Sequence, residues 1–161
     1  MLRAFELRDL DYFLDFFGDP EASQHVGGPS GREDTWRRML AGIGLWPLTG
    51  IGLWAIAERS GGPAIGHAGF FDFLRGCEPS IAQQAEMGWI LAPAVHGRGY
   101  AREACEAVLG WFDREFGRQP VWALISPGNE PSMKLALKLG FVRQPDGTYR
   151  DKPETIWLRP A

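Results

Sequence analysis

The chain has 161 residues, 45% of them hydrophobic and 23% charged, a composition typical of a soluble globular domain with a sizeable core. Its net charge of −3, without any run of Lys or Arg, argues against a nucleic-acid-binding protein. Two cysteines, Cys77 and Cys105, are too few for a disulfide framework, and the charged N-terminus MLRAFELRDLDYF does not read as a signal peptide. We therefore expect a cytoplasmic protein.

The longest uncharged stretch runs from Met39 to Ala57 and is 19 residues long, close to the minimum for a membrane-spanning helix. It is interrupted by Pro47 and by four glycines, which disfavour a continuous apolar helix. The pattern indicates the end of a helix, a loop and a strand, so we expect no membrane segment.

The first part of the chain predicts one short strand and two helices. Leu2–Phe5 is expected as the strand, and Asp9 is a candidate cap for the first helix. The apolar stripe of that helix consists of Tyr12, Phe13, Phe16 and Phe17. Gly31–Leu40 follows as a second helix, with acidic residues early and arginines late, as the helix dipole favours.

The middle of the chain predicts three strands. Gly52–Arg59 and Ala64–Phe73 are separated by the turn-forming residues SGGP, which favours a hairpin. Ala85–Leu91 is the next strand, and it runs into a glycine-rich segment.

The last part predicts two further helices and three strands. Apolar residues recur at helical spacing at Ala101, Ala104, Cys105, Val108, Leu109, Phe112 and Phe116, before a helix-ending Gly117. Val121–Ile125 is a buried strand, and Asn129 caps a helix that ends at Leu139. Phe141–Arg143 and Thr155–Leu158 are the final strands, joined across a Pro-Asp-Gly turn. The whole chain, residues 1–161, is expected to form one mixed α/β domain whose helices cover a sheet.

The segment VHGRGYAREA, residues 95–104, places two glycines directly before a helix. Glycine allows a ligand to approach the main chain closely, and successive N–H groups followed by a helix N-terminus form an anion site. Arg98 can add positive charge. A plain strand-to-helix turn would use the same glycines. Neither the P-loop pattern nor the complete dinucleotide pattern is present, since Arg102 stands where the last glycine would be.

The residues His96-Gly97-Arg98-Gly99-Tyr100-Ala101 resemble the motif Q/R-x-x-G-x-G/A of the GNAT family of acyl-CoA-dependent N-acetyltransferases, with histidine at the first position. Three longer segments resemble the RimJ/RimL-like branch: LRAFELRDLDYFLDFFGDPE, AEMGWILAPAVHGRGYAREACEAVLGW and ISPGNEPSMKLALKLGF. The resemblance implies the GNAT fold: a central mixed sheet flanked by helices, with a V-shaped splay between the fourth strand, Ala85–Leu91, and the fifth, Val121–Ile125.

The same resemblance implies acetyl-CoA, or coenzyme A, as the cofactor. The pyrophosphate would lie on the backbone of the 96–101 loop, and the pantetheine arm would bind the main chain of Trp89, Ile90 and Leu91 as an added strand. A free N–H of that strand would polarise the thioester carbonyl. Further contacts with coenzyme A are implied for Asn129, Ser132 and Lys138.

Acetyl transfer to an amine needs a proton acceptor. Glu86 is the candidate, because a carboxylate is unusual on an apolar strand and because alternation places it on one face with Gly88 and Ile90. A structural glutamate at a strand end would show the same pattern. The further candidates for the base are Glu78, Asp72 and His67.

The leaving thiolate can receive a proton from a tyrosine in many members of the family, but the matching position here is Ala136. Ser132 is the alternative donor, unless it only caps the helix or contacts coenzyme A. Tyr100 and Tyr149 match no donor position of the family. A thiolate is also a good leaving group, so the reaction can proceed without an acid.

We therefore expect an N-acetyltransferase that acetylates a primary amine, either a protein or peptide N-terminus or a small molecule. The alternative is a non-catalytic acyl-CoA-binding or regulatory module on the same fold. No His/Cys/Asp spacing suggests a metal. We expect no nucleic-acid or membrane partner. The sequence leaves two alternatives for the oligomeric state, a monomer and a homodimer.

Overall fold

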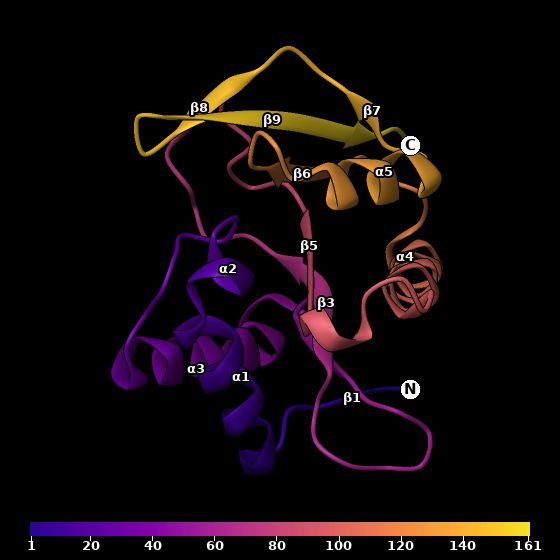
Figure 1. The fold of residues 1–161 in the computed structure, drawn as a ribbon. Helices are drawn as coiled ribbons and strands as arrows, with labels where there is room; N and C mark the ends of the chain where they lie inside the picture. The colour runs from indigo at the N-terminus through magenta and orange to yellow at the C-terminus, as the bar shows by residue number, and fades with distance from the viewer.

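The computed structural model describes residues 1–161, and Figure 1 shows how the helices and strands are arranged. The helices are α1 (Leu10–Gly18), α2 (Pro20–Ser23), α3 (Arg32–Thr49), α4 (Tyr100–Phe116) and α5 (Glu130–Lys138), with short 3₁₀ turns at Leu7–Asp9 and Pro93–Val95. The strands are β1 (Leu2–Arg3), β2 (Leu53–Ile56), β3 (Gly66–Phe71), β4 (Cys77–Glu78), β5 (Glu86–Leu91), β6 (Val121–Ile125), β7 (Val142–Arg143), β8 (Gly147–Tyr149) and β9 (Lys152–Arg159).

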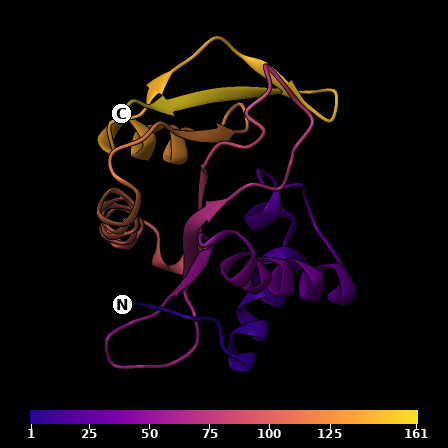
Figure 2. The same cartoon turned by 180° about the vertical axis from the view of Figure 1, so that it is seen from behind.

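The strands form one mixed sheet in the order β1-β2-β3-β5-β6-β9-β8-β4, and β7 also pairs with β9. Every pairing is antiparallel except that of β5 with β6. In Figure 1, β3 and β5 stand between α1–α3 on one side and α4 and α5 on the other, while β6 and β9 run transverse to β5. Figure 2 shows the same two layers from behind. The expected mixed α/β architecture is confirmed.

The sheet opens between β5 and β6. These strands share a single pair of facing residues, Glu86 and Trp122, whereas β3 and β5 share six pairs and β6 and β9 share five. The main-chain N–H of Trp122 donates to the carbonyl of Ala85 at 2.9 Å, and beyond this row β6 pairs only with β9. The V-shaped splay predicted between the fourth and fifth strands therefore lies between β5 and β6.

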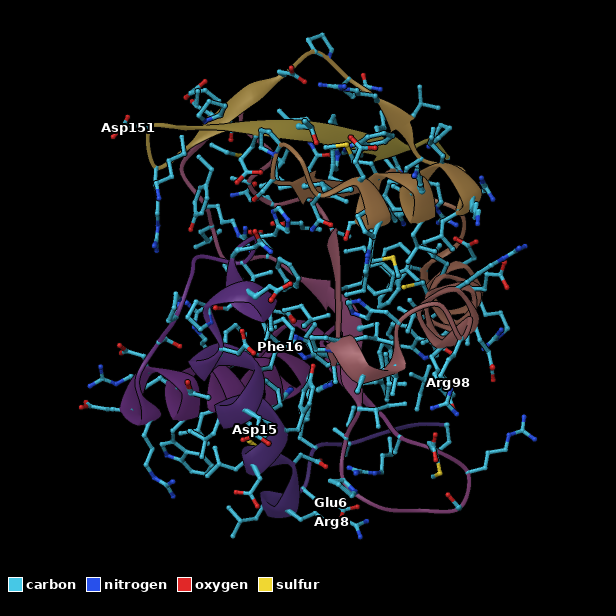
Figure 3. The ribbon with its side chains drawn as sticks, viewed as in Figure 1. Glu6, Arg8, Asp15, Phe16, Arg98 and Asp151 are labelled. Atoms are coloured by element: carbon cyan, nitrogen blue, oxygen red, sulfur yellow. The ribbon has the colours of Figure 1, made fainter.

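Two apolar cores cover the two faces of the sheet. The larger core joins α4 and α5 to the sheet and includes Met87, Leu91, Val108, Phe112, Val121, Phe141 and Trp157. The second joins α1 and α3 to the other face and includes Tyr12, Phe13, Phe16, Phe17, Met39, Ala55 and Ala64, with Ile90 packed against it. Phe16 lies between α1 and β5 in Figure 3. Alternation along β5 therefore directs Glu86 and Gly88 toward the α1–α3 face together with Ile90; the sequence predicts that these three share a face.

The helix predicted at Gly31–Leu40 is longer, because α3 continues to Thr49 and includes Pro47. The ring of Trp46 anchors its last turn: Nε1 donates to the carbonyl of Leu53 at 3.1 Å, and the ring packs on other tryptophans. Gly50 then ends the helix in the left-handed conformation. No helix of the structure is long and apolar enough to cross a membrane.

The connection between the last two predicted strands is more elaborate than one Pro-Asp-Gly turn. β7 pairs with the C-terminal half of β9, and the inserted β8 forms a hairpin with its N-terminal half. The hairpin turns at Arg150 and Asp151, both with positive φ. Arginine rarely adopts this conformation, so the sequence does not signal the turn. β4, which pairs with β8, was also missed because two residues carry no period.

Asp9 does not cap α1 as predicted, since its side chain makes no capping hydrogen bond to that helix. It is fully buried, its carboxylate accepts two hydrogen bonds of 2.7 Å from Arg3, and it accepts one from the N–H of Glu6 and one from that of Ala64, each at 2.8 Å. Burial alone would raise the pKa of Asp9, but these hydrogen bonds outweigh burial and lower it. Asp9 therefore ties β1, α1 and the β2–β3 hairpin together.

Asp9→Ala should lower the free energy of unfolding by about 3–5 kcal/mol at pH 7, because it leaves Arg3 without its partner. Since the folded pKa of Asp9 is lowered, the stabilisation is present above the unfolded-state pKa and is lost as the pH falls through the folded one. Urea unfolding of both chains at pH 7 and pH 3 measures this. Asp146→Ala removes an exposed ion pair with Arg143 and should cost less than about 1 kcal/mol. If both variants lost the same free energy of unfolding, Asp9 would not be the group that ties these elements together.

Candidate active site

The glycine-rich loop before α4 has the open backbone that an anionic ligand needs. Gly97 and Gly99 have φ angles of 74° and 85°, and no atom lies within 4 Å of a Cβ built on either. Gly99 is the N-cap of α4 and offers no side-chain cap, and the first intrahelical bond runs from the N–H of Glu103 to its carbonyl. The N–H groups of the first turn of α4 are thus free of side-chain partners. This geometry fits the pyrophosphate of coenzyme A.

Two side chains of the loop are already engaged. His96 Nε2 lies 3.0 Å from the carbonyl oxygen of Leu91, and because a carbonyl only accepts, this nitrogen carries the proton. Arg98 lies over the ring of Tyr100 and 3.6 Å from Glu58, and it sits beside α4 away from α1–α3 (Figure 3). The hydroxyl of Tyr100 donates to Glu58 at 2.7 Å. The structure therefore directs Arg98 and Tyr100 toward Glu58.

The main chain of β5 faces β3 and β6 alternately. The N–H of Ala92 donates to Ile65 on the β3 side, whereas the carbonyl of Ala85 accepts from Trp122 on the β6 side. Alternation then places the main-chain groups of Trp89 and Leu91 toward β6, where the splay leaves them without a strand partner. Ile90, predicted as a third contact, instead has its main chain in the ladder with β3.

Glu86 lies at the single row where β5 and β6 still pair. Its side chain is only 6% exposed and accepts no hydrogen bond from the protein; its one ion pair is with Arg75, whose Nε lies 3.3 Å from Oε2. Burial raises the pKa of Glu86 to about 7; the charge of Arg75 lowers the pKa, and those of Asp72 and Glu154 raise it. A carboxyl that titrates near neutrality and has free lone pairs can accept a proton from an amine.

The reserve candidates are engaged elsewhere. Asp72 accepts from the main-chain N–H groups of Leu74 at 2.8 Å and Gln83 at 2.9 Å, so it holds its own loop closed. Glu78 is exposed on β4. His67 is buried, stacked on a phenylalanine of α1, and its burial lowers its pKa to about 4. Among these four, only Glu86 is a buried carboxyl without a hydrogen bond, and its one ion pair is with Arg75.

Sequence reasoning missed Arg75 and Glu154. The guanidinium of Arg75 lies 5.1 Å from the ring centroids of both Phe71 and Tyr149, which come from β3 and β8. Glu154 of β9 has one oxygen 3.2 Å from the hydroxyl of Ser126 and another that is fully buried without a partner. Neither residue belongs to a recognisable motif. A weak signal existed for Glu154, which directly precedes the predicted last strand, Thr155–Leu158, and falls on the period-two face of Ile156.

The residues predicted on α5 lie beside β6 (Figure 1). Asn129 caps the helix as expected, with its side-chain oxygen accepting from the N–H of Ser132 at 3.3 Å. The hydroxyl of Ser132 is half-buried and makes no hydrogen bond within the protein. Ala136 is fully buried, and Lys138 is exposed at the end of the helix.

Neither cysteine presents a reactive thiol. Both are buried and unpaired, and burial raises the pKa of Cys105, which lies in the core as its position on the helical stripe predicts. The structure contains no group of three or more His, Cys, Asp or Glu side chains that could hold a metal ion.

The sequence profile of the Acetyltransferase (GNAT) domain matches residues 1–142. The chain belongs to the GNAT acetyltransferase family. It is therefore an acyltransferase, and acetyl-CoA is the donor that this family uses. This supports the enzymatic interpretation over a non-catalytic binding module.

Relatives cover nearly the whole chain. The uncharacterized protein YkkB of Bacillus subtilis (strain 168) is 31% identical, with 98% of this chain and 90% of YkkB aligned. A protein of Bordetella pertussis assigned to the GNAT acetyltransferases has a TM-score of 0.80 at 31% identity, covering 98% of this chain and 93% of its own. An acetyltransferase of Agrobacterium tumefaciens strain C58 has a TM-score of 0.84 at 28% identity, covering 98% and 88%.

RimL, the ribosomal L7/L12 alpha-N-protein acetyltransferase, has a TM-score of 0.77 at 15% identity and covers 99% of this chain and 89% of its own. An identity this low shows a shared fold alone. The finer assignment to the RimJ/RimL-like branch stays a prediction.

Gly99→Val should raise the dissociation constant of acetyl-CoA at least tenfold, about 1.4 kcal/mol, because the side chain would cover the N–H groups at the mouth of α4. Calorimetric titration with coenzyme A measures this. Gly50→Val is the matched control: Gly50 has φ 76° and ψ −2°, against 85° and −8° for Gly99, and it also has open space around it. Both variants carry the strain of left-handed valine. Equal affinity in the Gly99 and Gly50 variants would refute the loop assignment.

Proposed function

We propose that this protein transfers the acetyl group of acetyl-CoA directly to a primary amine, with Glu86 as the general base. The observation that carries the proposal is the state of Glu86, a buried carboxyl without a hydrogen bond, at the row where β5 and β6 part. A structural glutamate at a strand end would have its oxygens satisfied. A buried glutamate that accepts no hydrogen bond at this row, with a pKa near neutrality, is suited to proton transfer.

Acetyl-CoA, when bound, supplies the thioester whose carbonyl carbon the amine attacks. On the protein's side, the N–H of Trp89 faces the splay and is the candidate donor to the thioester oxygen. Glu86 faces the α1–α3 side of the sheet, so the amine would approach from that side. The 96–101 backbone would hold the pyrophosphate, while His96 fixes the carbonyl of Leu91 and so the end of β5.

α5 would complete the donor site from the other side of the splay. Its capped N-terminus contributes Asn129 and the free hydroxyl of Ser132, which we assign to the departing sulfur. Lys138, exposed at the C-terminal end of the helix, is assigned to the phosphates of the adenosine moiety.

The acceptor is a protein N-terminus or a small-molecule amine, as in the RimJ/RimL-like branch that the sequence resembles. The two buried, unpaired cysteines fit the cytoplasmic setting proposed from the composition. Purified protein incubated with acetyl-CoA and a panel of peptides, amino acids, polyamines and aminoglycosides tests the proposal through release of free thiol. No thiol release above the acceptor-free rate with any amine would reject it.

Glu86→Gln should lower the rate of acetyl transfer about 10²-fold or more at pH 7, because glutamine cannot accept the proton. The affinity for acetyl-CoA should stay unchanged, since the donor contacts on β5 are main-chain. The loss should shrink as the pH rises, because more of the acceptor is then already neutral. Rates between pH 6 and 9 and calorimetric titration measure these quantities.

Glu78→Gln is the control, because it removes an exposed carboxylate from neighbouring β4 and should leave the pH profile unchanged. The Glu86 variant should fold, since glutamine imitates the protonated carboxyl. Burial raises the pKa of Glu86 from 4.5 to about 7 in the folded chain, so the stability that this residue costs grows as the pH rises from about 4.5 to about 7 and is complete above that. The neutral variant should therefore melt no lower than the parent at pH 8. Near-normal turnover with an unaltered profile would remove Glu86 from the mechanism.

Ser132→Ala should reduce kcat by about tenfold or less, at all pH values alike, because a thiolate leaves readily without full protonation. Asn129 still caps α5 in this variant, since it accepts from the N–H of residue 132 rather than from the hydroxyl. A drop in melting temperature in place of a drop in kcat would assign Ser132 to the helix alone.

A further inference from the structure

Arg75 occupies an unusual position for an arginine. It comes from the loop between β3 and β4, its side chain is only 24% exposed, and its guanidinium lies over the rings of Phe71, Phe73 and Tyr149. None of its N–H groups donates a hydrogen bond within the protein, and its one ionic contact is with Glu86. The aromatic rings therefore hold the cation in place while its charge stays uncompensated by hydrogen bonds.

The charged groups around Glu86 come from two other elements. Arg75 and Asp72 lie on the β3–β4 loop, and Glu154 lies on β9. Asp72 is bound to the main chain of its own loop. Among the other buried titratable side chains on the α1–α3 side, Asp9 is paired with Arg3. Tyr12 and His67 are neutral near pH 7, because burial raises the pKa of Tyr12 and lowers that of His67 to about 4.

We propose that Arg75 and Glu154 are positioning residues of opposite sign that set the protonation state of Glu86. The inference rests on the proposed role of Glu86 as the base. Arg75, 3.3 Å away and held between two rings, favours the carboxylate that can accept a proton. The charge of Glu154, which has one buried oxygen without a partner, raises the pKa of Glu86 and so favours the protonated form. Neither residue needs to touch the substrate.

The balance matters because a base works best when its pKa is near the working pH. Burial favours the protonated form of Glu86, and a fully paired glutamate would be too weak a base. A cation that lies close to Glu86 without a hydrogen bond to it gives a carboxyl of intermediate basicity. In a partly buried site its field is little screened by solvent, so small changes in local charge move the titration strongly.

Selective ¹³C labelling of glutamate carboxyls tests the proposal without an acceptor. The signal of Glu86, assigned by its loss in Glu86→Gln, should titrate near pH 7 in the parent chain. In Arg75→Gln the midpoint should rise by about one pH unit, the usual scale for losing a nearby opposite charge. In Glu154→Gln it should fall. Arg75→Lys, which keeps the charge, should restore most of the parent value, and Arg143→Gln, which breaks an exposed pair on β7, should leave it unchanged.

The kinetic profiles should move the same way. One acceptor is used throughout, so its own titration is common to all variants. Differences between the pH profiles of kcat/KM then reflect the titration of Glu86. Arg75→Gln should lose about fivefold in kcat/KM at pH 7 and recover by pH 9, since a midpoint one unit higher leaves about a tenth of Glu86 ionised at pH 7. Glu154→Gln should extend activity to lower pH.

Unchanged midpoints, or shifts of the same sign in the Arg75 and Glu154 variants, would overturn the proposal. If Arg75→Gln does not fold, Arg75→Lys and Glu154→Gln still decide it, since the first must keep the midpoint and the second must lower it. Opposite shifts in the titration without any acetyl transfer would refute the proposed function instead, and would leave the electrostatic arrangement standing.

Discussion

The site depends on one constraint: β5 and β6 pair at a single row and then separate within one sheet. Parallel neighbours normally satisfy each other's main-chain groups along their whole length. Here the main-chain groups of Trp89 and the N–H of Leu91 face a gap, while His96 binds the carbonyl of Leu91. Unsatisfied main-chain groups are unfavourable unless water or a ligand binds them. The remaining strand order keeps the gap open, because β3 holds β5 through six residue pairs and β9 holds β6 through five. A ligand with amide groups along its length can pair with such an edge as a strand does.

The two faces of the splay are built for different purposes. The α4–α5 face is an apolar core into which Met87 and Val108 pack, and it fixes the helix whose N-terminus carries the glycine-rich loop. The opposite face of the same strand buries Glu86, beside Arg75 of the β3–β4 loop, instead of another apolar side chain. A carboxyl whose pKa is raised by burial opposes folding once it ionises. Burial of Glu86 thus lowers the free energy of unfolding at high pH, and the same burial gives the site a carboxyl that can exchange a proton.

Helices, strands and caps that depend on neighbouring residues could be predicted from the sequence, whereas contacts between residues far apart in the chain could not. The residues of β6 and the cap of α5 at Asn129 are as predicted, because apolar runs and capping residues act within a few positions. Asp9 was misassigned because its decisive partners include the N–H of Ala64, 55 residues away. The neighbours of Glu86 were missed for the same reason: Arg75 is placed by an aromatic ring of β8, a strand with no sequence period.

This division also explains why the donor can be inferred from the sequence and the acceptor cannot. Everything assigned to the pyrophosphate and the pantetheine arm on this side of the splay lies within residues 89–101, one strand and the loop that follows it. The groups on the amine's side come from distant segments: the loop after α2 reaches Ser126 through the carbonyl of His25, and Glu154 and Arg75 come from β9 and the β3–β4 loop. Loops vary while the scaffold that positions them persists. The proposed donor contacts thus come from one contiguous segment, whereas the groups near the proposed base come from separate segments that the sequence does not bring together.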